Sequence, residues 1–267
     1  DDTLLAGAGG DDMDGGDGID TADFTGETEA LTLLINSTRQ VVGGTETMVG
    51  VENVVGTGLG DAITGDAGAN RIFGRLGNDT LSGGAGANFL RGEEGNDSIV
   101  GGAGFDDASG NMGDDTVSGG DGDDWVVGGK DQDRLSGGEG ADIVLGNLGN
   151  DTCDGGAGAD IIRGGQQDDV LTGGAGNDYL SGDRNNDTLT GGSGADIFHS
   201  FSGAAIDRVL DFSAAEGDRI QLDAGSAYIL RQSGADTIVD MGAGDQVILV
   251  GVSMSSLTAS SIFFGPA

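Results

Sequence analysis

Residues 173–181 read Gly-Gly-Ala-Gly-Asn-Asp-Tyr-Leu-Ser, and this nine-residue unit recurs without a change of register from Gly56 to His199. The segment divides into 16 units. Position one is Gly in all 16 units, position six is Asp in 14 of them, and position eight is apolar throughout. A strict period of this kind predicts a solenoid, in which each repeat is stabilised by its neighbours.

The length of the unit indicates how one repeat folds. Six residues rich in Gly suit a turn, and the other three suit a short strand whose middle side chain, at position eight, points inward. Two units complete one coil, and successive coils stack as paired strands do. We therefore expect an all-β fold, a right-handed parallel β-roll of nonapeptide repeats with a C-terminal β cap.

The same register extends backwards to the first residues of the chain. Asp2, Asp11 and Asp20 fall at position six, so residues 1–23 are expected to form partial repeats. Asp1 falls at position five of a unit that lacks its beginning. We therefore expect a longer array to precede this chain.

Departures from the period divide the rest of the chain. Between residues 24 and 55 the period is lost, and the strand-like runs 30–35 and 48–55 predict a β insertion. Residues 56–199 form the roll of nonapeptides. Residues 200–267 lose the period again, and their alternation of apolar and polar residues predicts antiparallel strands that cap the open end of the roll.

The charge of the chain requires a cationic ligand. Asp and Glu number 46 against 11 Lys and Arg, which gives a formal net charge of −35. This charge opposes compaction and repels nucleic acid and anionic membrane surfaces, so we expect neither as a partner. No apolar run approaches the ~18 residues of a membrane span.

The repeat places its carboxylates where calcium can bind. Because unit i lies beneath unit i+2, the position-six side chains form a column along each edge of the roll. Gaps between such turns suit a hard cation that accepts six to eight oxygen ligands, which favours Ca²⁺ over Mg²⁺ or zinc, and we expect roughly a dozen ions. The expected carboxylate ligands are Asp2, Asp11, Asp20, Asp61, Asp79, Asp97, Asp106, Asp115, Asp124, Asp133, Asp142, Asp151, Asp160, Asp169, Asp178, Asp187 and Asp196.

Two units depart from this pattern. Asn70 and Asn88 replace Asp at position six in stacked units, so the site between them has no carboxylate. We expect it to be the weakest site or to remain empty.

The unit resembles the G-G-x-G-x-D-x-U-x repeat of RTX (hemolysin-type calcium-binding) proteins, and the chain is similar to the C-terminal parts of type I-secreted exoproteins such as serralysin-like proteins. The resemblance implies that carbonyls of positions two and four, with the position-six Asp, face carbonyls of positions one and three and the Asp of unit i+2. One such site would join Gly120, Gly122 and Asp124 to Gly137, Glu139 and Asp142.

The resemblance also implies a cellular role. The chain is expected to be exported by a type I ABC exporter that reads an uncleaved C-terminal signal, and to be extracellular or displayed at a bacterial cell surface. It would stay unfolded before export and fold on extracellular Ca²⁺, acting as a secretion and stability module of a larger exoprotein.

The sequence offers no catalytic residues. Cys153 occupies the core position eight, and His199, the single histidine, is expected at the surface at position nine of the last unit. We expect no Ser-His-Asp arrangement and no enzymatic activity in this chain.

The two outer faces of the roll differ in composition. Odd-numbered units present mostly Thr and Ser, whereas even-numbered units present apolar side chains that include Phe89, Trp125, Ile143, Ile161 and Tyr179. Either this chain covers the apolar face, or a partner or a second copy docks there. An alternative function is therefore a calcium-dependent surface-layer or adhesive protein that assembles with itself.

Overall fold

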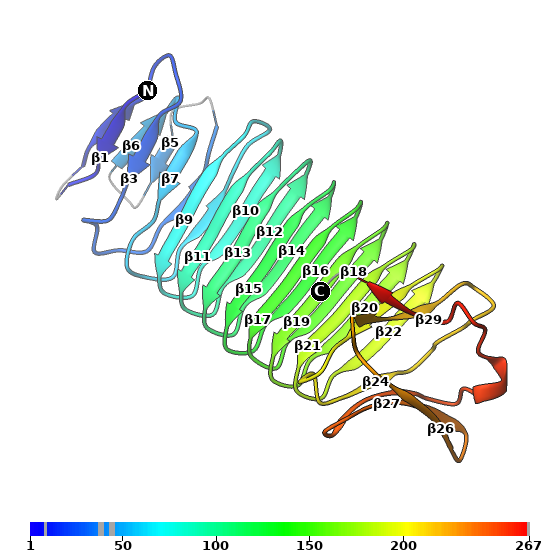
Figure 1. Cartoon of the computed structure of the whole chain (residues 1–267). Helices are drawn as coiled ribbons and strands as arrows, with labels where there is room; N and C mark the ends of the chain where they lie inside the picture. The colour runs from blue at the N-terminus through cyan, green and yellow to red at the C-terminus, as the bar shows by residue number, and fades with distance from the viewer. Residues whose placement is uncertain (8–9, 37–39, 43–45, 266–267) are drawn as a thin grey trace. The chain divides into compact units, whose positions relative to one another are not determined.

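The computed structural model of the protein describes residues 1–7, 10–36, 40–42 and 46–265, without the side chains of residues 40–46. The chain forms two compact units, Asp1–Lys130 and Asp131–Ala267. In each unit, strands from successive coils lie side by side (Figure 1). The predicted all-β parallel roll is confirmed in both units. In the part of the chain that the structure describes, no helix is long and apolar enough to span a bilayer.

The first unit contains two sheets of parallel strands and a small third sheet. The order in one sheet is β1 (Thr3–Leu5), β3 (Thr21–Asp23), β7 (Asn53–Val55), β9 (Arg71–Leu76), β11 (Phe89–Glu94), β13 (Asp107–Met112) and β15 (Trp125–Lys130). The facing sheet has the order β4 (Thr32–Leu34), β8 (Ala62–Thr64), β10 (Thr80–Ala85), β12 (Ser98–Ala103) and β14 (Thr116–Asp121). In the small sheet, β6 (Glu46–Val49) pairs parallel to β2 (Asp12–Asp14) and antiparallel to β5 (Gln40–Val42).

The second unit continues the same design with its own two sheets. One contains β17 (Ile143–Leu148), β19 (Ile161–Gln166), β21 (Tyr179–Arg184), β23 (Ile197–Ser200), β25 (Arg219–Asp223) and β29 (Ile262–Gly265). The other contains β16 (Arg134–Glu139), β18 (Thr152–Ala157), β20 (Val170–Ala175), β22 (Thr188–Ser193), β24 (Ile206–Val209), β28 (Asp245–Leu249), β27 (Asp236–Gly242) and β26 (Ile229–Ser233). A short 3₁₀ turn, η1 (Met254–Ser256), precedes β29.

Position eight supplies the core of both units, as predicted. The position-eight side chains of all 16 repeats are at most 3% exposed. Cys153 is one of them, a free thiol that is 1% exposed and whose pKa is raised well above its usual value, first by burial and then by nearby aspartates. A buried neutral thiol is a packing residue rather than a nucleophile.

The strands are longer than the sequence predicts, and the division into a six-residue turn and a three-residue strand is wrong. From β9 to β22 each strand has six residues, because positions two and three of the next unit also pair with the neighbouring coil. In the β9–β11 pair, for example, Glu93 lies opposite Arg75 and Glu94 opposite Leu76. The ladder is interrupted only at position one, and the left-handed φ of Arg75 (86°) and Glu93 (81°) bends the chain there. Only positions four to six remain as turn.

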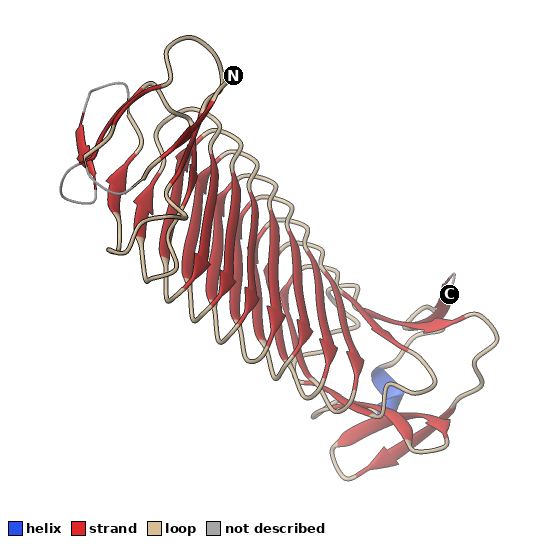
Figure 2. Cartoon of the chain, turned by 90° about the vertical axis from the view of Figure 1, so that its left-hand side faces the viewer, coloured by secondary structure: helices blue, strands red, loops and turns tan. Residues whose placement is uncertain are grey.

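The non-repeat segments also take part in the sheets. Within residues 24–55, β4 pairs with β8, and β7 pairs with both β3 and β9. In the C-terminal segment, β26, β27 and β28 are antiparallel, as expected, and Figure 2 shows this part beside the last coils of its unit. The expectation of antiparallel strands is wrong for β24 and β25, which pair parallel with β22 and β23. β25 follows Asp218, as the repeat strands follow their aspartates, and β24 contains Asp207.

Candidate metal centres

The position-six aspartates form hydrogen-bonded columns. The backbone N–H of Asp79 donates to Oδ1 of Asp97 at 2.8 Å, and that of Asp151 donates to Oδ1 of Asp169 at 2.8 Å. The same bond, across 18 residues, recurs along both edges of the roll within each unit. One carboxylate oxygen of each residue is thereby fixed by the next coil, and the predicted stacking of unit i beneath unit i+2 is present.

The other carboxylate oxygen, Oδ2, faces the gap between turns. Among the described residues, it is buried and has no hydrogen-bond partner in Asp20, Asp79, Asp97, Asp106, Asp151, Asp160, Asp169, Asp178, Asp187 and Asp196. Buried carboxylates without a partner are strongly destabilising. A column of such oxygens therefore fits a bound cation.

Burial raises the pKa values of these carboxyl groups. The pKa of Asp79 is raised to about 7 and that of Asp169 to about 8, with desolvation as the main cause and neighbouring aspartates of the column as a further one. The pKa of Asp178 is raised to about 6 for the same reasons. Without a cation the columns are therefore held partly protonated near neutral pH, and a divalent cation would favour the ionised form.

Glycine at position one leaves room for the Oδ2 atoms. A Cβ atom at Gly92 would lie 1.9 Å from Oδ2 of Asp97, and one at Gly164 would lie 2.2 Å from Oδ2 of Asp169. Both distances are far below a nonbonded contact, which has its optimum at roughly 3.5–4.0 Å. Any larger residue at position one would displace the carboxylate from its column.

Glycine at position four lets the backbone of one turn lie close to the carbonyl oxygen of the turn stacked on it. Gly158 has a φ of +144°, and a Cβ there would lie 1.6 Å from the carbonyl oxygen of Gly140. Among the described residues, no three His, Cys, Asp or Glu side chains are grouped so as to hold a metal. Carbonyl oxygens of stacked turns lie close together here, and they are a type of ligand that Ca²⁺ accepts.

The predicted ligands differ in their surroundings. From Asp61 to Asp196, every expected carboxylate is buried, and so is Asp20. Asp11 is half-buried, with Oδ2 accepting from the N–H of Gly7, and Asp2 is exposed. Glu139 is also exposed, which fits a contribution through its carbonyl. Gly120, Gly122 and Asp124 belong to the first unit and Gly137, Glu139 and Asp142 to the second, so their pairing stays a prediction.

Three acidic residues outside the nine-residue register extend the columns. The N–H of Asp187 donates to Oδ1 of Asp207 at 3.4 Å, and that of Asp196 donates to Oδ1 of Asp218 at 3.0 Å. Near the N-terminus, Glu52 accepts from the N–H of Asp20 at 2.8 Å. These partners are 20, 22 and 32 residues apart instead of 18, so counting by nine misses them. The available signal is that Glu52 and Asp218 directly precede a strand and Asp207 lies at the start of one.

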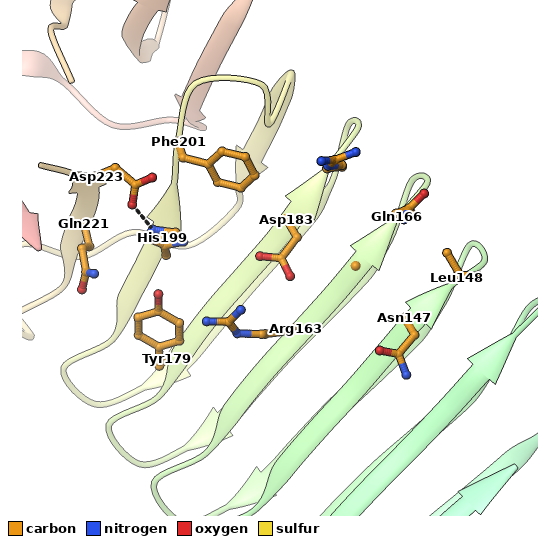
Figure 3. Close-up of a pocket in the computed structure, with 12 residues that line it drawn as sticks. Asn147, Leu148, Arg163, Gln166, Tyr179, Asp183, His199, Phe201, Gln221 and Asp223 are labelled. Carbon is orange, nitrogen blue, oxygen red and sulfur yellow. Dashed lines mark hydrogen bonds and ion pairs between the residues drawn. The ribbon is translucent and has the colours of Figure 1, made fainter. Parts of the chain in front are cut away.

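His199, which the sequence places at the surface, lies on the outer face but is largely covered by its neighbours. Its side chain is 12% exposed, its Nδ1 lies 3.1 Å from Oγ of Ser181, and its Nε2 lies 3.1 Å from Oδ1 of Asp223. The ring stacks between Tyr179 and Phe201, in a hollow of about 850 Å³ on the outer face of the second unit (Figure 3).

This row is a Ser-His-Asp arrangement, which the sequence analysis did not expect. Ser181 is fully buried, and its hydroxyl also donates to Oδ1 of Asp183 at 2.6 Å. A hydroxyl with no exposed surface is not accessible to a substrate. The row therefore ties β21, β23 and β25 together.

Comparison with known proteins supports the repeat assignment. The family model of the RTX calcium-binding nonapeptide repeat matches residues 1–22, 55–90, 91–126, 118–153, 154–189 and 172–204. No curated protein matches the chain significantly.

Two solved structures are similar in part. The extracellular lipase LipA from Serratia marcescens is 18% identical with a TM-score of 0.33, and the match covers 82% of this chain and 41% of the lipase. The AlgE6R3 subunit of the Azotobacter vinelandii mannuronan C5-epimerase is 29% identical with a TM-score of 0.31, covering 50% of this chain and 78% of the subunit. The chain thus spans less than half the length of the lipase.

Proposed function

The chain belongs to the family of RTX calcium-binding nonapeptide-repeat proteins, and from this premise we propose that it is the calcium-folded module of a secreted bacterial exoprotein. The observation that carries the proposal is the column of buried Oδ2 atoms without partners among the described residues. In the second unit, Asp151, Asp169 and Asp187 would hold ions along one edge, and Asp160, Asp178 and Asp196 along the other. Bound Ca²⁺ supplies the positive charge and the oxygen coordination that these carboxylates lack.

The aspartates of the columns also make folding depend on the calcium concentration, which differs between the cytosol and the outside of the cell. In a cytosol with little free Ca²⁺, repulsion within the columns and the backbone entropy of 57 glycines favour an unfolded chain that can be threaded through an exporter. Extracellular calcium sites commonly have dissociation constants of ~10⁻⁴ to 10⁻³ M, so millimolar Ca²⁺ folds the roll outside the cell. A type I ABC exporter would read the C-terminal segment, residues 200–267, and folding would stabilise a passenger domain upstream.

Calorimetric titration tests the binding directly. After removal of calcium, titration with CaCl₂ should show roughly a dozen ions bound per chain with dissociation constants of ~10⁻⁴ to 10⁻³ M. MgCl₂ under the same conditions should bind weakly, because Mg²⁺ prefers rigid octahedral sites and retains its waters. A stoichiometry of one or two Ca²⁺ ions, or equal binding of both metals, would contradict the proposal.

A second candidate function, calcium-dependent self-association, rests on exposed apolar side chains of one sheet in each unit. Trp125 in β15 of the first unit is 46% exposed and Ile161 in β19 of the second is 42% exposed, so the described residues of this chain leave much of their surface open. Phe89 in the sheet of β15, and Ile143 and Tyr179 in the sheet of β19, are half-buried. Exposed aromatic side chains of this kind are typical anchors of protein interfaces.

Substitution of Trp125 separates this candidate from the calcium module. Sedimentation velocity in millimolar Ca²⁺ should show association of the wild type, and Trp125→Ser should weaken it by about 2 kcal/mol or more, roughly 30-fold, with calcium binding unchanged. Val100→Ser is the control, because Val100 is 45% exposed but lies in β12, in the facing sheet of the same unit. A wild type that stays monomeric rules out self-association.

A further inference from the structure

The regular column begins, in the first unit, beside turns that are not nonapeptide turns. Asp61 lies next to Leu31, which belongs to the non-repeat segment before β4. The N–H of Leu31 donates to Oδ1 of Asp61 at 2.7 Å. Asn70 lies next to Glu52. Three residues separate β6 from β7, whereas six separate β8 from β9, so the segment that carries Glu52 is shorter than a nonapeptide unit. An ion at either place would lack the carbonyl ligands that a complete neighbouring turn supplies.

In these gaps, beside Asp61 and Asn70, hydrogen-bond donors of the chain lie where an ion would otherwise bind. Oδ2 of Asp61 accepts from the N–H of Thr57 at 2.7 Å and from its hydroxyl at 3.2 Å, and both residues are buried. Oδ2 of Asp61 is therefore satisfied without an ion, unlike Oδ2 of Asp79 one coil further on.

On the other edge, an amide group replaces the carboxylate oxygen. Nδ2 of Asn88 donates to the carbonyl of Gly86 at 3.2 Å and to Oδ1 of Asp106 at 2.9 Å. Nδ2 of Asn70 donates to the carbonyl of Glu52 at 2.7 Å. An amide N–H pair carries partial positive charge, so it takes over the interaction that a cation makes with these oxygens.

The columns end in the same way in the second unit. Asp207 and Asp218 lie beyond the last repeat, and each has a donor for its second oxygen. Oδ2 of Asp207 accepts from the hydroxyl of Ser200 at 3.1 Å, and Oδ2 of Asp218 accepts from the N–H of Ser213 at 2.7 Å.

We infer that the chain terminates the regular part of its calcium array with hydrogen-bond donors: Thr57, Asn70 and Asn88 close the columns in the first unit, and Ser200 and Ser213 close them in the second. This inference rests on the proposed calcium binding and specifies which positions hold no ion. The turns of Asp61 and Asn70 have a complete neighbour on one side only, so an ion there would have half its ligands. Asn88, one coil further in, supplies an amide where an ion would need a carboxylate. The donors remove the need for an ion, and ions occupy only gaps between complete turns whose position-six residues are both aspartates.

Asn88→Asp tests the inference, because it restores the carboxylate next to a complete turn that contains Asp106. The matched control is Asn96→Asp, which makes the same chemical change at the exposed position five. Equilibrium dialysis at saturating Ca²⁺ should show about one additional ion per chain in Asn88→Asp and none in Asn96→Asp. Equal stoichiometry in the two variants, with the wild type binding many ions, overturns the inference alone. A wild type that binds no calcium overturns the proposed function as well.

A second measurement does not depend on how the variant folds. Crystals of the wild type grown with calcium should give anomalous density beside Oδ2 of Asp79 and Asp169. They should give none between Asn88 and Asp106. Density at that position would overturn the inference.

Discussion

Removal of calcium should abolish most of the far-UV circular dichroism signal of the β-roll, and millimolar Ca²⁺ should restore it in one cooperative transition. The physical reason is that the buried Oδ2 atoms have no partner of their own among the described residues. At ~10 mM Ca²⁺ and a Kd of ~1 mM, each site adds about 1.4 kcal/mol, so about ten sites add about 14 kcal/mol. That sum is comparable to the ~5–15 kcal/mol by which a domain is typically stable, so we expect calcium to decide whether the chain folds.

Cooperativity follows from the stacking. Each aspartate donates its N–H to the carboxylate of the next coil, so an ion that orders one turn also positions a ligand of the next site. The measurement is a calcium titration by circular dichroism, with MgCl₂ at the same concentrations as the control. A chain that keeps its β signal in EGTA would show that the apolar core alone holds the fold. The proposal that the chain is unfolded in the cytosol and folds outside the cell would then be wrong.

Much of the fold could be predicted from the sequence because two positions repeat without a slip. Position eight predicts the core, since a side chain such as Leu180 must point inward in every coil, and it is fully buried. Position six predicts the columns, since stacking at a fixed interval of 18 residues places Asp151 beside Asp169. Both predictions depend only on spacing along the chain, which the sequence displays directly.

Other features could not be predicted, because spacing alone does not determine them. The length of the strands depends on whether positions two and three pair with the next coil, and residues such as Glu93 do so by adopting a left-handed φ that is unusual for glutamate. Asp207 and Asp218 join the columns across irregular intervals, which the end of the repeat conceals. Asp223 reaches His199 for the same reason, from a strand beyond the last nonapeptide.

Acidification should partly replace calcium. In calcium-free buffer, the chain should gain β structure as the pH falls from about 8 to about 4.5. Asp79, Asp169 and Asp178 have pKa values raised from 3.8 to about 7, about 8 and about 6, so the metal-free fold binds protons more tightly than the unfolded chain. Their contribution to stability is fully present below the unfolded pKa and is lost as the pH rises through 6 to 8. The measurement is circular dichroism of the metal-free chain against pH.

Calcium binding has the opposite pH dependence and weakens as the pH falls, because Ca²⁺ binds the ionised carboxylates and competes with these protons. The calcium concentration at the midpoint of binding, measured by calorimetry, should therefore be higher at pH 5 than at pH 8. Asp169→Asn mimics the protonated form, so it should make the metal-free chain less sensitive to pH above 6 while weakening calcium binding. Asp121→Asn, at an exposed residue outside the columns, is the control and should change neither. If the metal-free chain instead lost β structure on acidification, the buried carboxylates would not be what keeps it unfolded, and repulsion within the columns would have to be discarded as the basis of the switch.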